Sequence, residues 1–465
     1  MSLANTQWEP HEIGAALLGK KILWFIGIGG IHMSSHALLS RERGFTVRGS
    51  DCAENENTRR LEGAGISVCR GHDPSALADA DAVVYTLAIS EDNPEYLEAR
   101  RRGLPLFSRA DYLGYLMSDF PSRIGIAGSH GKSTVTAMLG EILDVAGRAP
   151  NIVCGADMPH FGAPFAAGGG KDFLFEACEY GNSFLRFSPT LAVVLNAELD
   201  HVDFFKDEAS LITSFSRFIQ KADAAVLPKE CAALRRAAQG RPAVTFGLGT
   251  NADYRAQNLS LEGGTAQFDL YFPKGCVGRV SLAVPGEHNV KNALAAAAAA
   301  DLLGVRPSDI TAALSHFSGI ARRFQYRGRL NGARVFDDYA HHPTEIKTAL
   351  HTARSLCKGG RLFAVFQSHT FSRTKAFFED ICAALSGADR VLIADIYAAR
   401  EKDPLGMSAK ALADGIGRTA SVGGDFAAMA KVLQRELTEK DLLLVMGAGD
   451  VDRIFGEFSK KHFTL

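Results

Sequence analysis

A glycine-rich turn followed by a lysine and two hydroxyl residues is the part of this sequence best suited to chemistry. The apolar residues 124–127 lead into Gly128-Ser129-His130-Gly131-Lys132-Ser133-Thr134, and a helical pattern follows. Glycines allow backbone N–H groups to face anionic oxygens, and a helix start adds the positive end of its dipole. Lys132 would reach the terminal phosphates, and the Ser133 hydroxyl would bind Mg²⁺. We therefore predict a nucleotide phosphate site. The alternative is an ordinary strand-to-helix turn, since the first glycine of the usual spacing falls on Ile126.

A second glycine turn, Gly27-Ile28-Gly29-Gly30, follows the apolar residues 21–26. Asp51 lies about where dinucleotide-binding folds place a ribose-binding acid. The pattern favours a diphosphate at the helix start, and the alternative is a tight turn at the head of a doubly wound sheet. A full fingerprint would need glycine at His32, whose imidazole either obstructs a diphosphate or donates to a phosphate or ribose oxygen. We favour donation; if His32 donates as an imidazolium, affinity should fall as the pH rises through the histidine range.

Acidic and histidine side chains follow two further predicted strands. Glu176 ends the apolar residues 173–176, and His201 follows residues 191–195 after a short polar segment. Because ligands of open α/β sheets gather beyond the carboxyl ends of strands, both could meet the glycine loop at one Mg²⁺-nucleotide. A carboxylate suits Mg²⁺, whereas a histidine ligand is unusual for so hard an ion. The alternative for each residue is a helix cap or a solvated side chain.

Cationic and polar residues gather again in the C-terminal third. Arg322-Arg323 opens this section, Asp337-Asp338-Tyr339-Ala340-His341-His342 ends its first predicted strand, and residues 367–373 end the second. Arginine and histidine at such strand ends would suit a carboxylate or a phosphate. Surface charge is the alternative for any one of them, but two successive strand ends repeat the pattern.

Alternating strands and helices must position these side chains, which indicates the α/β class. We expect three α/β units, residues 1–120, 121–318 and 319–465, with a boundary at Pro121 and a composition change near Ser318. Residues 253–284 alternate polar and apolar with glycine turns, which predicts a small antiparallel excursion. Asn289 is expected to cap the alanine-rich helix that comes next. The predicted strands lie near residues 21–26, 46–48, 82–86, 104–107, 173–176, 191–195, 224–227, 334–336, 362–366, 391–394 and 442–445.

The composition is that of a globular protein of several domains. The chain has 465 residues, 46% hydrophobic and 22% charged, with a net charge of −1. That balance argues against a general nucleic-acid or membrane-surface binder. No apolar run approaches the length of a membrane span, and the N-terminus lacks an export signal. Eight scattered cysteines without C-x-x-C or zinc spacing indicate reduced thiols, so we expect a cytoplasmic protein.

These motifs together resemble the Mur ligases of bacterial cell-wall synthesis, over nearly the whole chain. The first turn with Met33-Ser34 is similar to the family's UDP-binding turn, and Gly128–Thr134 to its ATP loop. Gly286-x-His288-Asn289-x-x-Asn292 is similar to its adenine-contacting segment, and the Tyr-Ala-His-His-Pro-Thr-Glu string from Tyr339 to a third-domain motif. The resemblance implies a Rossmann-like N-terminal domain, a central P-loop ATPase domain and a Rossmann-like C-terminal domain.

The resemblance also implies an activity: an ATP-dependent ligase that joins L-alanine to the lactyl carboxylate of UDP-N-acetylmuramate through an acyl phosphate. The implied catalytic residues are Lys132, Glu176 and His201, and the implied metal ligands are Ser133, Glu176 and His201. The implied ATP-binding residues are Gly128, Ser129, His130, Gly131, Lys132, Ser133, Thr134, His288, Asn289, Asn292, Arg323 and Asp338. The implied UDP-sugar-binding residues are Gly27, Ile28, Gly29, Gly30, Ile31, His32, Met33, Ser34 and Asp51. The implied amino-acid-binding residues are Tyr339, His341 and Arg373.

The expected partners are therefore small molecules, namely UDP-N-acetylmuramate, L-alanine and ATP with Mg²⁺. Neither nucleic acid nor membrane is expected, and the protein would be a monomer or a homodimer. One rival is the related recycling ligase, which joins the same UDP-sugar to a ready-made tripeptide; Arg322-Arg323-Phe324 favours the alanine ligase. A non-catalytic nucleotide-binding paralogue is suggested by His32. A dinucleotide-dependent oxidoreductase is suggested only by residues 27–51.

Overall fold

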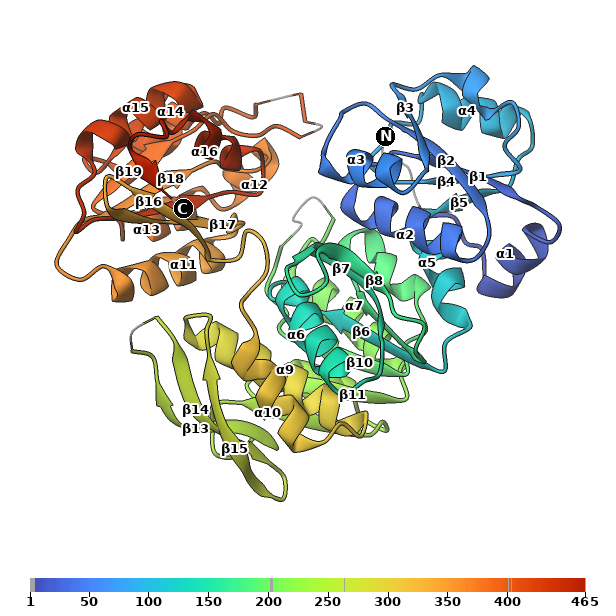
Figure 1. Cartoon of the computed structure of the whole chain (residues 1–465), viewed down its shortest axis with the longest axis horizontal. Coiled ribbons are helices and arrows are strands. Elements are labelled where there is room, and N and C mark those ends of the chain that lie inside the picture. Colours follow the sequence, from blue (N-terminus) through green and yellow to red (C-terminus); the bar gives the residue numbers. More distant parts are fainter. Residues whose placement is uncertain (1–4, 201–203, 263, 400, 403, 465) are drawn as a thin grey trace.

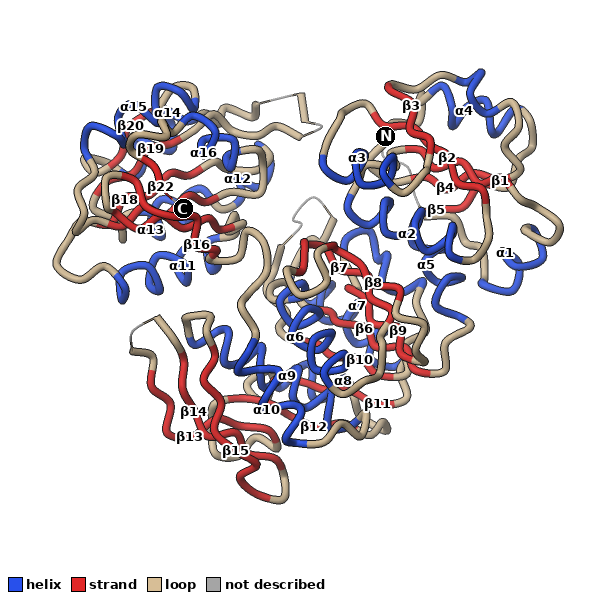
Figure 2. Tube along the Cα trace, viewed as in Figure 1, coloured by secondary structure: helices blue, strands red, loops and turns tan. Residues whose placement is uncertain are grey.

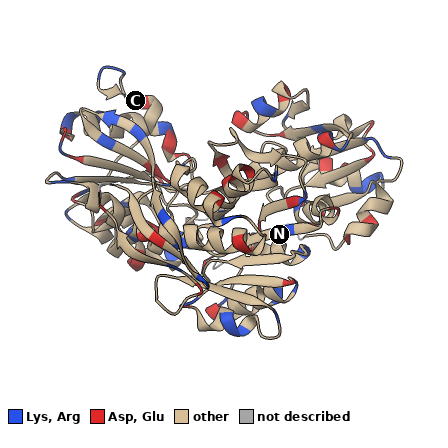
Figure 3. Ribbon diagram, turned by 60° about the horizontal axis from the view of Figure 1, so that its bottom comes forward, with Lys and Arg blue, Asp and Glu red and all other residues tan. Residues whose placement is uncertain are grey.

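The computed structural model describes residues 5–200, 204–262, 264–399, 401–402 and 404–464. These residues form three lobes, each built around its own β-sheet (Figures 1 and 2). The central lobe lies between the other two, and the first and third flank it in the view of Figure 1. No helix in the described ranges is long and apolar enough to cross a membrane. In the view of Figure 3, acidic and basic residues are interspersed along the ribbon.

The first lobe, as far as it is described, carries a five-stranded parallel sheet of order β3-β2-β1-β4-β5. The strand order reverses between β1 and β4, and ligands of such sheets bind at the carboxyl edge near the reversal. Its strands are β1 (Ile22–Ile26), β2 (Thr46–Asp51), β3 (Ser67–Arg70), β4 (Ala82–Tyr85) and β5 (Leu106–Ser108). Its helices are α1 (Pro10–Ala16), α2 (Ile31–Glu42), α3 (Glu56–Gly63), α4 (Pro94–Arg101) and α5 (Arg109–Ser118), with a 3₁₀ turn at Pro74–Leu77.

The second lobe holds a ten-stranded sheet within the described residues, of order β15-β14-β13-β12-β11-β10-β6-β9-β7-β8. Its middle strands are parallel, and antiparallel pairs close both edges. The strands are β6 (Ser122–Ala127), β7 (Asn151–Met158), β8 (Ala163–Ala167), β9 (Asp172–Glu176), β10 (Leu191–Val194), β11 (Ala224–Pro228), β12 (Ala243–Gly247), β13 (Tyr254–Ser260), β14 (Ala266–Phe272) and β15 (Gly275–Leu282). The helices are α6 (Lys132–Val145), α7 (Glu208–Gln220), α8 (Ala232–Ala237), α9 (Glu287–Leu302) and α10 (Pro307–His316), with a 3₁₀ segment at Tyr180–Arg186.

The third lobe has a seven-stranded sheet in its described part, of order β20-β19-β18-β21-β17-β16-β22. The strands are β16 (Gln325–Leu330), β17 (Ala333–Asp338), β18 (Leu362–Phe366), β19 (Arg390–Ile393), β20 (Ala420–Val422), β21 (Leu442–Met446) and β22 (Phe463–Thr464). The helices are α11 (Pro343–Leu356), α12 (Phe371–Ala376), α13 (Phe378–Leu385), α14 (Ala409–Ile416), α15 (Phe426–Glu436) and α16 (Ile454–Glu457), with a 3₁₀ turn at Val451–Arg453. The strands β17, β21, β18, β19 and β20 run parallel, so their carboxyl ends share one edge.

Helix α2 joins the first two lobes. Residues 33–40 of α2 are all buried, because the helix packs against the first sheet and also against β7 and β8 of the second lobe. Serine and histidine occur among these buried residues, so polar groups of α2 lie inside the boundary between lobes. The glycine turn at residues 27–30, which precedes α2, is therefore held close to the second lobe.

The α/β class is confirmed, and each strand predicted from apolar runs is present, with ends shifted by a few residues. The antiparallel excursion is also confirmed as β13, β14 and β15. One expectation is wrong: Asn289 does not cap α9, which starts two residues earlier after Gly286. Gly286 adopts φ +96°, a conformation that glycine takes readily, and it fills the capping position without a side chain.

Candidate active site

The glycine loop lies between β6 and α6, at the carboxyl edge of the second sheet. Gly128 and Gly131 have φ of +143° and +85°, values that disfavour other residues. A Cβ on Gly131 would lie 2.7 Å from the Asn292 side-chain oxygen, and one on Gly128 would lie 3.0 Å from Leu195 Cβ. Glycine is therefore required here by conformation and by space, and α6 begins at Lys132 as the sequence predicts.

Lys132 is folded back onto the loop. Its Nζ donates to the Ser129 carbonyl at 3.2 Å and pairs with Glu179 Oε2 at 3.1 Å. Burial alone would lower the pKa of Lys132, but Glu179, Cys178 and Glu176 together outweigh burial and raise that pKa above its ordinary value. The Glu179 side chain is only 2% exposed, so the pair is shielded from water. The ammonium is thus held charged beside the place predicted for the phosphates.

Glu176 lies at the end of β9, paired in register with Ile126 of β6. Its carboxylate accepts a hydrogen bond from Gly155 N–H, and a Cβ on Gly155 would lie 2.9 Å from Glu176 Oε2. Glycine at position 155 therefore leaves room for the carboxylate. Ser133 is buried in the first turn of α6, and Cys154 Sγ contacts both its carbonyl and the Glu176 carboxylate, so the two residues are near neighbours. Hard oxygen ligands of this kind fit Mg²⁺. His201, the third predicted ligand, lies outside the described residues.

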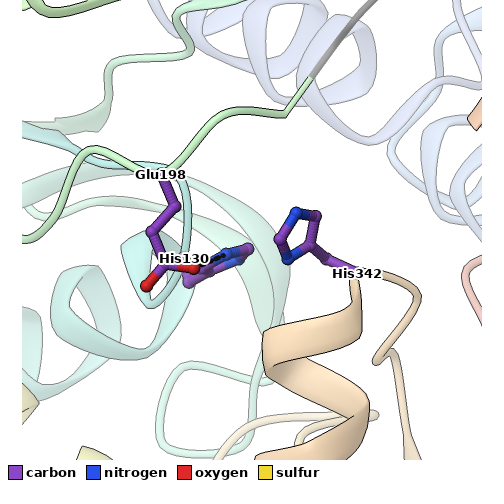
Figure 4. A group of neighbouring side chains, drawn as sticks. All are labelled: His130, Glu198 and His342. Atoms are coloured by element: carbon purple, nitrogen blue, oxygen red, sulfur yellow. Dashed lines mark ion pairs between the residues drawn. The ribbon is translucent and has the colours of Figure 1, made fainter. Parts of the chain in front are cut away.

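A group of side chains links the second lobe to the third. Figure 4 shows the His342 ring, at the start of α11, facing the His130 ring and the Glu198 carboxylate. His130 Nδ1 lies 3.0 Å from Glu345 Oε1 of α11, and His130 Nε2 lies 3.4 Å from Glu198 Oε2. Burial opposes charge on His130, but the two carboxylates raise its pKa to about 9. We call His130, Glu198, His342 and Glu345 the interlobe clasp.

Ligand atoms of His130, Glu198 and His342 lie within 4.8 Å of one another, a separation that would admit a metal ion. The hydrogen bonds of His342 argue against that use. Its Nε2 lies 3.2 Å from the Leu199 carbonyl, and its Nδ1 accepts from Thr344 N–H as the cap of α11. Nδ1 is therefore the acceptor, so Nε2 carries the proton and has no lone pair for a metal. Ion pairs and hydrogen bonds hold the clasp together, although His130 Nε2 meets Glu198 only as an ion pair and makes no hydrogen bond in the described structure.

The predicted third-lobe residues lie at the edge that faces the second lobe. Arg373 Nη2 pairs with Asp200 Oδ1 at 3.0 Å, with both side chains at most 10% exposed. Arg323 Nη1 lies 3.4 Å from Glu345 Oε1, and its guanidinium lies 5.4 Å from the centroid of the Tyr339 ring. The pairing of Arg373 with Asp200 joins the third lobe to the second.

Two buried residues of this edge have shifted pKa values. Burial raises the pKa of Asp338 to about 6, although the carboxyl accepts from the N–H groups of Phe324 and Ala340. Burial lowers the pKa of His341 to about 4, and His341 Nδ1 lies 2.9 Å from the Tyr339 carbonyl. A neutral imidazole at His341 can position a ligand by hydrogen bonding, but does not add positive charge near pH 7.

The predicted adenine-contacting residues stand on the first turns of α9. Asn289 Nδ2 donates to the Pro285 carbonyl at 2.7 Å, and Asn292 Nδ2 lies 3.3 Å from Asn289 Oδ1. Burial lowers the pKa of His288 to about 4, and its Nδ1 has no hydrogen-bond partner in the described structure. Asn292 lies beside Gly131, so this helix start borders the glycine loop.

The first-lobe turn is built as the sequence predicts, but Asp51 is engaged differently. Gly29 N–H donates to Asp51 Oδ2 at 2.9 Å, so the carboxylate braces the turn. His32 is the second residue of α2, where a helical conformation needs no glycine. Burial and the nearby Arg109 lower the pKa of His32 to about 4. The lowered pKa argues against an imidazolium donor near neutral pH, whereas a neutral N–H can still donate; donation by His32 to a phosphate or ribose oxygen stays a prediction.

Comparison with known proteins identifies the family. The family models named Mur ligase family, catalytic domain; Mur ligase middle domain; and Mur ligase, glutamate ligase domain match residues 23–121, 126–300 and 322–449. A UDP-N-acetylmuramate–L-alanine ligase from Caldicellulosiruptor bescii is 40% identical over 447 residues, covering 94% of this chain and 98% of the relative. The chain belongs to the Mur ligase family.

Solved structures of Mur ligases agree with this assignment. The UDP-N-acetylmuramate–alanine ligase MurC of Thermotoga maritima superposes with a TM-score of 0.82 at 28% identity, covering 95% of this chain and 98% of that one. A murein peptide ligase from Psychrobacter arcticus gives a TM-score of 0.71 at 25% identity, covering 94% and 97%. The three-domain Mur ligase architecture predicted from the motifs is confirmed.

Several acids at the centre of this Mur ligase were not singled out by sequence reasoning. The sequence does offer a signal for Glu179, because it follows the predicted metal ligand Glu176 by three residues. Glu198 acts on His130 from a different strand end of the same lobe, and Glu345 acts on His130 from the third lobe; no local pattern in the sequence signals such partners.

Proposed function

We propose that this Mur ligase joins L-alanine to the lactyl carboxylate of UDP-N-acetylmuramate, with conversion of ATP to ADP and phosphate. The observation that carries the proposal is that the carboxyl edges of the second and third sheets face each other, with α2 and its glycine turn packed against the second lobe. Lys132 and Glu176 come from the second lobe, while His341 and Arg373 come from the third. Supporting it, a relative 40% identical over 94% of the chain bears the name of that ligase.

The reaction needs two steps. A lactyl carboxylate oxygen forms a bond to the γ-phosphorus of ATP as the bond to ADP breaks, giving an acyl phosphate. The neutral amine of L-alanine then attacks the acyl carbon, phosphate leaves, and the amine nitrogen loses a proton. Phosphoryl transfer depends on positioning of the reactants and on stabilisation of their negative charge more than on covalent participation by the protein. Lys132 and the loop N–H groups would stabilise that charge once the ammonium exchanges Glu179 for a phosphate oxygen.

Ser133 and Glu176 would hold Mg²⁺, with His201 proposed as a further ligand. When bound, the ion supplies Lewis-acid charge to phosphate oxygens. The room that Gly155 leaves beside Glu176 favours this assignment. In the ligand-bound enzyme, Glu176 would exchange part of its contact with Gly155 N–H for the ion.

The third lobe would bring the amino acid and exclude water. Tyr339, His341 and Arg373 would orient L-alanine, and Arg323, Asp338 and α9 would border the nucleotide. Exclusion of water matters because an acyl phosphate hydrolyses readily. We propose domain boundaries near residues 120 and 318. We also propose a cytoplasmic monomer or homodimer that acts on small molecules.

A phosphate-release assay tests the proposal. Release should require UDP-N-acetylmuramate and L-alanine together, and the product should contain an amide. Release with the tripeptide but not with L-alanine would instead support the recycling ligase. No release with any amino acid, despite nucleotide binding, would support a non-catalytic paralogue.

A further inference from the structure

Arg109 is a half-buried arginine without a partner. It is the first residue of α5, directly after β5, and so lies at the carboxyl edge of the first sheet. Among the described residues, none hydrogen-bonds its side chain and no carboxylate lies within 4.0 Å. Some other half-buried arginines have acidic partners, as Arg148 with Asp172 and Arg186 with Asp111, while Arg123 and Arg334 donate to backbone carbonyls instead.

The surroundings of Arg109 are also short of acceptors. His32 and His36 lie one turn apart on α2, which packs against α5. His32 Nε2 and both ring nitrogens of His36 are buried without a hydrogen-bond partner in the described structure. Burial lowers the pKa of Arg109 and of both histidines, and Arg109 lowers the two histidine values further, as expected for close neighbours. An anion would satisfy donors that the protein leaves unpaired.

The position of Arg109 lies between the two sites already described. On one side is His32, next to the predicted UDP-binding turn; on the other, Glu176 and Cys178 of the second lobe are near enough to act on its charge. The lactyl group belongs to the sugar carried by UDP, yet its carboxylate must reach the γ-phosphate beside Lys132. Arg109 lies near both sites, close to His32 of the first lobe and to Glu176 of the second.

We propose that Arg109 binds the lactyl carboxylate of the UDP-sugar and directs it toward the ATP loop, an inference that rests on the proposed function. A guanidinium matches a carboxylate through two parallel N–H···O bonds, which a lysine cannot reproduce. One carboxylate oxygen can remain on Arg109 while the other forms the bond to phosphorus. The acyl phosphate that results is still an anion, so Arg109 keeps a charged partner until the amine attacks.

Calorimetric titration of the full-length protein tests this role with two probes. UDP-N-acetylmuramate carries the lactyl carboxylate, whereas UDP-N-acetylglucosamine has the same nucleotide and a like sugar without it. Arg109→Gln should weaken binding of the first about 10- to 100-fold and leave binding of the second, or of UDP itself, unchanged. Arg109→Lys should recover only part of the loss. Arg100→Gln, which removes an exposed charge from α4 of the same lobe, should bind both probes like the parent.

Equal weakening for both probes would mean that Arg109 contacts the diphosphate, and would overturn the proposal, as would unchanged binding of both. Failure of the parent to bind UDP-N-acetylmuramate would instead refute the proposed function itself. Thermal unfolding without ligand separates a structural role. Because Arg109 has no acidic partner to lose, Arg109→Gln should melt at the parent temperature or above. A lower melting temperature together with weaker binding of both probes would show that Arg109 supports the fold.

Discussion

Glu345 of α11 is the acid that most directly ties the third lobe to the ATP loop. Its carboxylate lies 3.0 Å from His130 Nδ1 of the second lobe and 3.4 Å from Arg323 Nη1. It also accepts from His342 N–H in the capping box of α11. Glu345→Gln keeps an acceptor oxygen for the cap but removes the charge that faces His130. We predict that the two lobes separate more readily in this variant.

The size of the effect follows from the pKa of His130. A rise from 6.5 to about 9 corresponds to about 3 kcal/mol, at about 1.4 kcal/mol per unit. Glu198 and Glu345 both contribute, so the loss of one carboxylate should cost about 1–2 kcal/mol, or about a 5- to 30-fold shift toward open lobes. Because the pKa of His130 is raised, its contribution is complete below pH 6.5 and is lost as the pH rises through about 9. The pKa of Glu345 is lowered, so its contribution is present above the ordinary carboxyl range and is lost in acid.

Small-angle scattering from pH 6 to 10 measures the separation of the lobes, and NMR of labelled histidine measures the pKa of His130. The parent should expand as the pH passes about 9, and Glu345→Gln should expand at lower pH. Glu379→Gln, which removes an exposed charge from α13 in the same lobe, is the matched control. An unchanged radius of gyration up to pH 10, or a His130 pKa near 6.5 in the parent, would refute the reasoning.

Three further predictions concern the proposed substrate site. Lys132→Ala should lower turnover at least about 100-fold. It should also lower the melting temperature, because Glu179 loses the ammonium with which it pairs. The double variant Lys132→Ala/Glu179→Gln should recover stability but not turnover. Glu176→Ala should raise the Mg²⁺ concentration needed for phosphate release, and a Mg²⁺ titration that overlays the parent would exclude it as a ligand. Because the pKa of His32 is about 4, its imidazole stays neutral between pH 6 and 8, and its charge should not affect binding of UDP-N-acetylmuramate in that range. Calorimetry that shows a loss of affinity with rising pH in the parent but not in His32→Gly would contradict this.

Elements with strong local signals could be predicted from the sequence. The strand β6, the glycine loop and α6 agree with one another, because apolar residues, glycines and a helical pattern occur in succession. The β7–β8 pair was not predicted. Its register shifts between Val153 and Met158, so the alternation that marks a strand is interrupted. The start of α9 was misplaced because Asn289 is a good capping residue by type, whereas the positive φ of Gly286 is invisible in sequence.

The edges at which the site residues gather could also be predicted, since parallel strands share a carboxyl edge. The partners of those residues could not. Asp200 and Arg373 are 173 positions apart, and nothing near either residue indicates the other. From the sequence alone, Lys132 and Arg373 are therefore expected to be cations that are free to bind substrate.

In the structure those cations are already occupied. Lys132 holds Glu179, Arg373 holds Asp200 and His130 holds Glu345. A phosphate or carboxylate that binds any of them must displace a buried acid, so the measured affinity is the difference between two charge-assisted contacts. The displaced acid must then find a cation or a proton, which couples substrate binding to rearrangement between the lobes. Arg109 differs because no carboxylate of the described residues pairs with it, so an anion that binds there need not displace an acid.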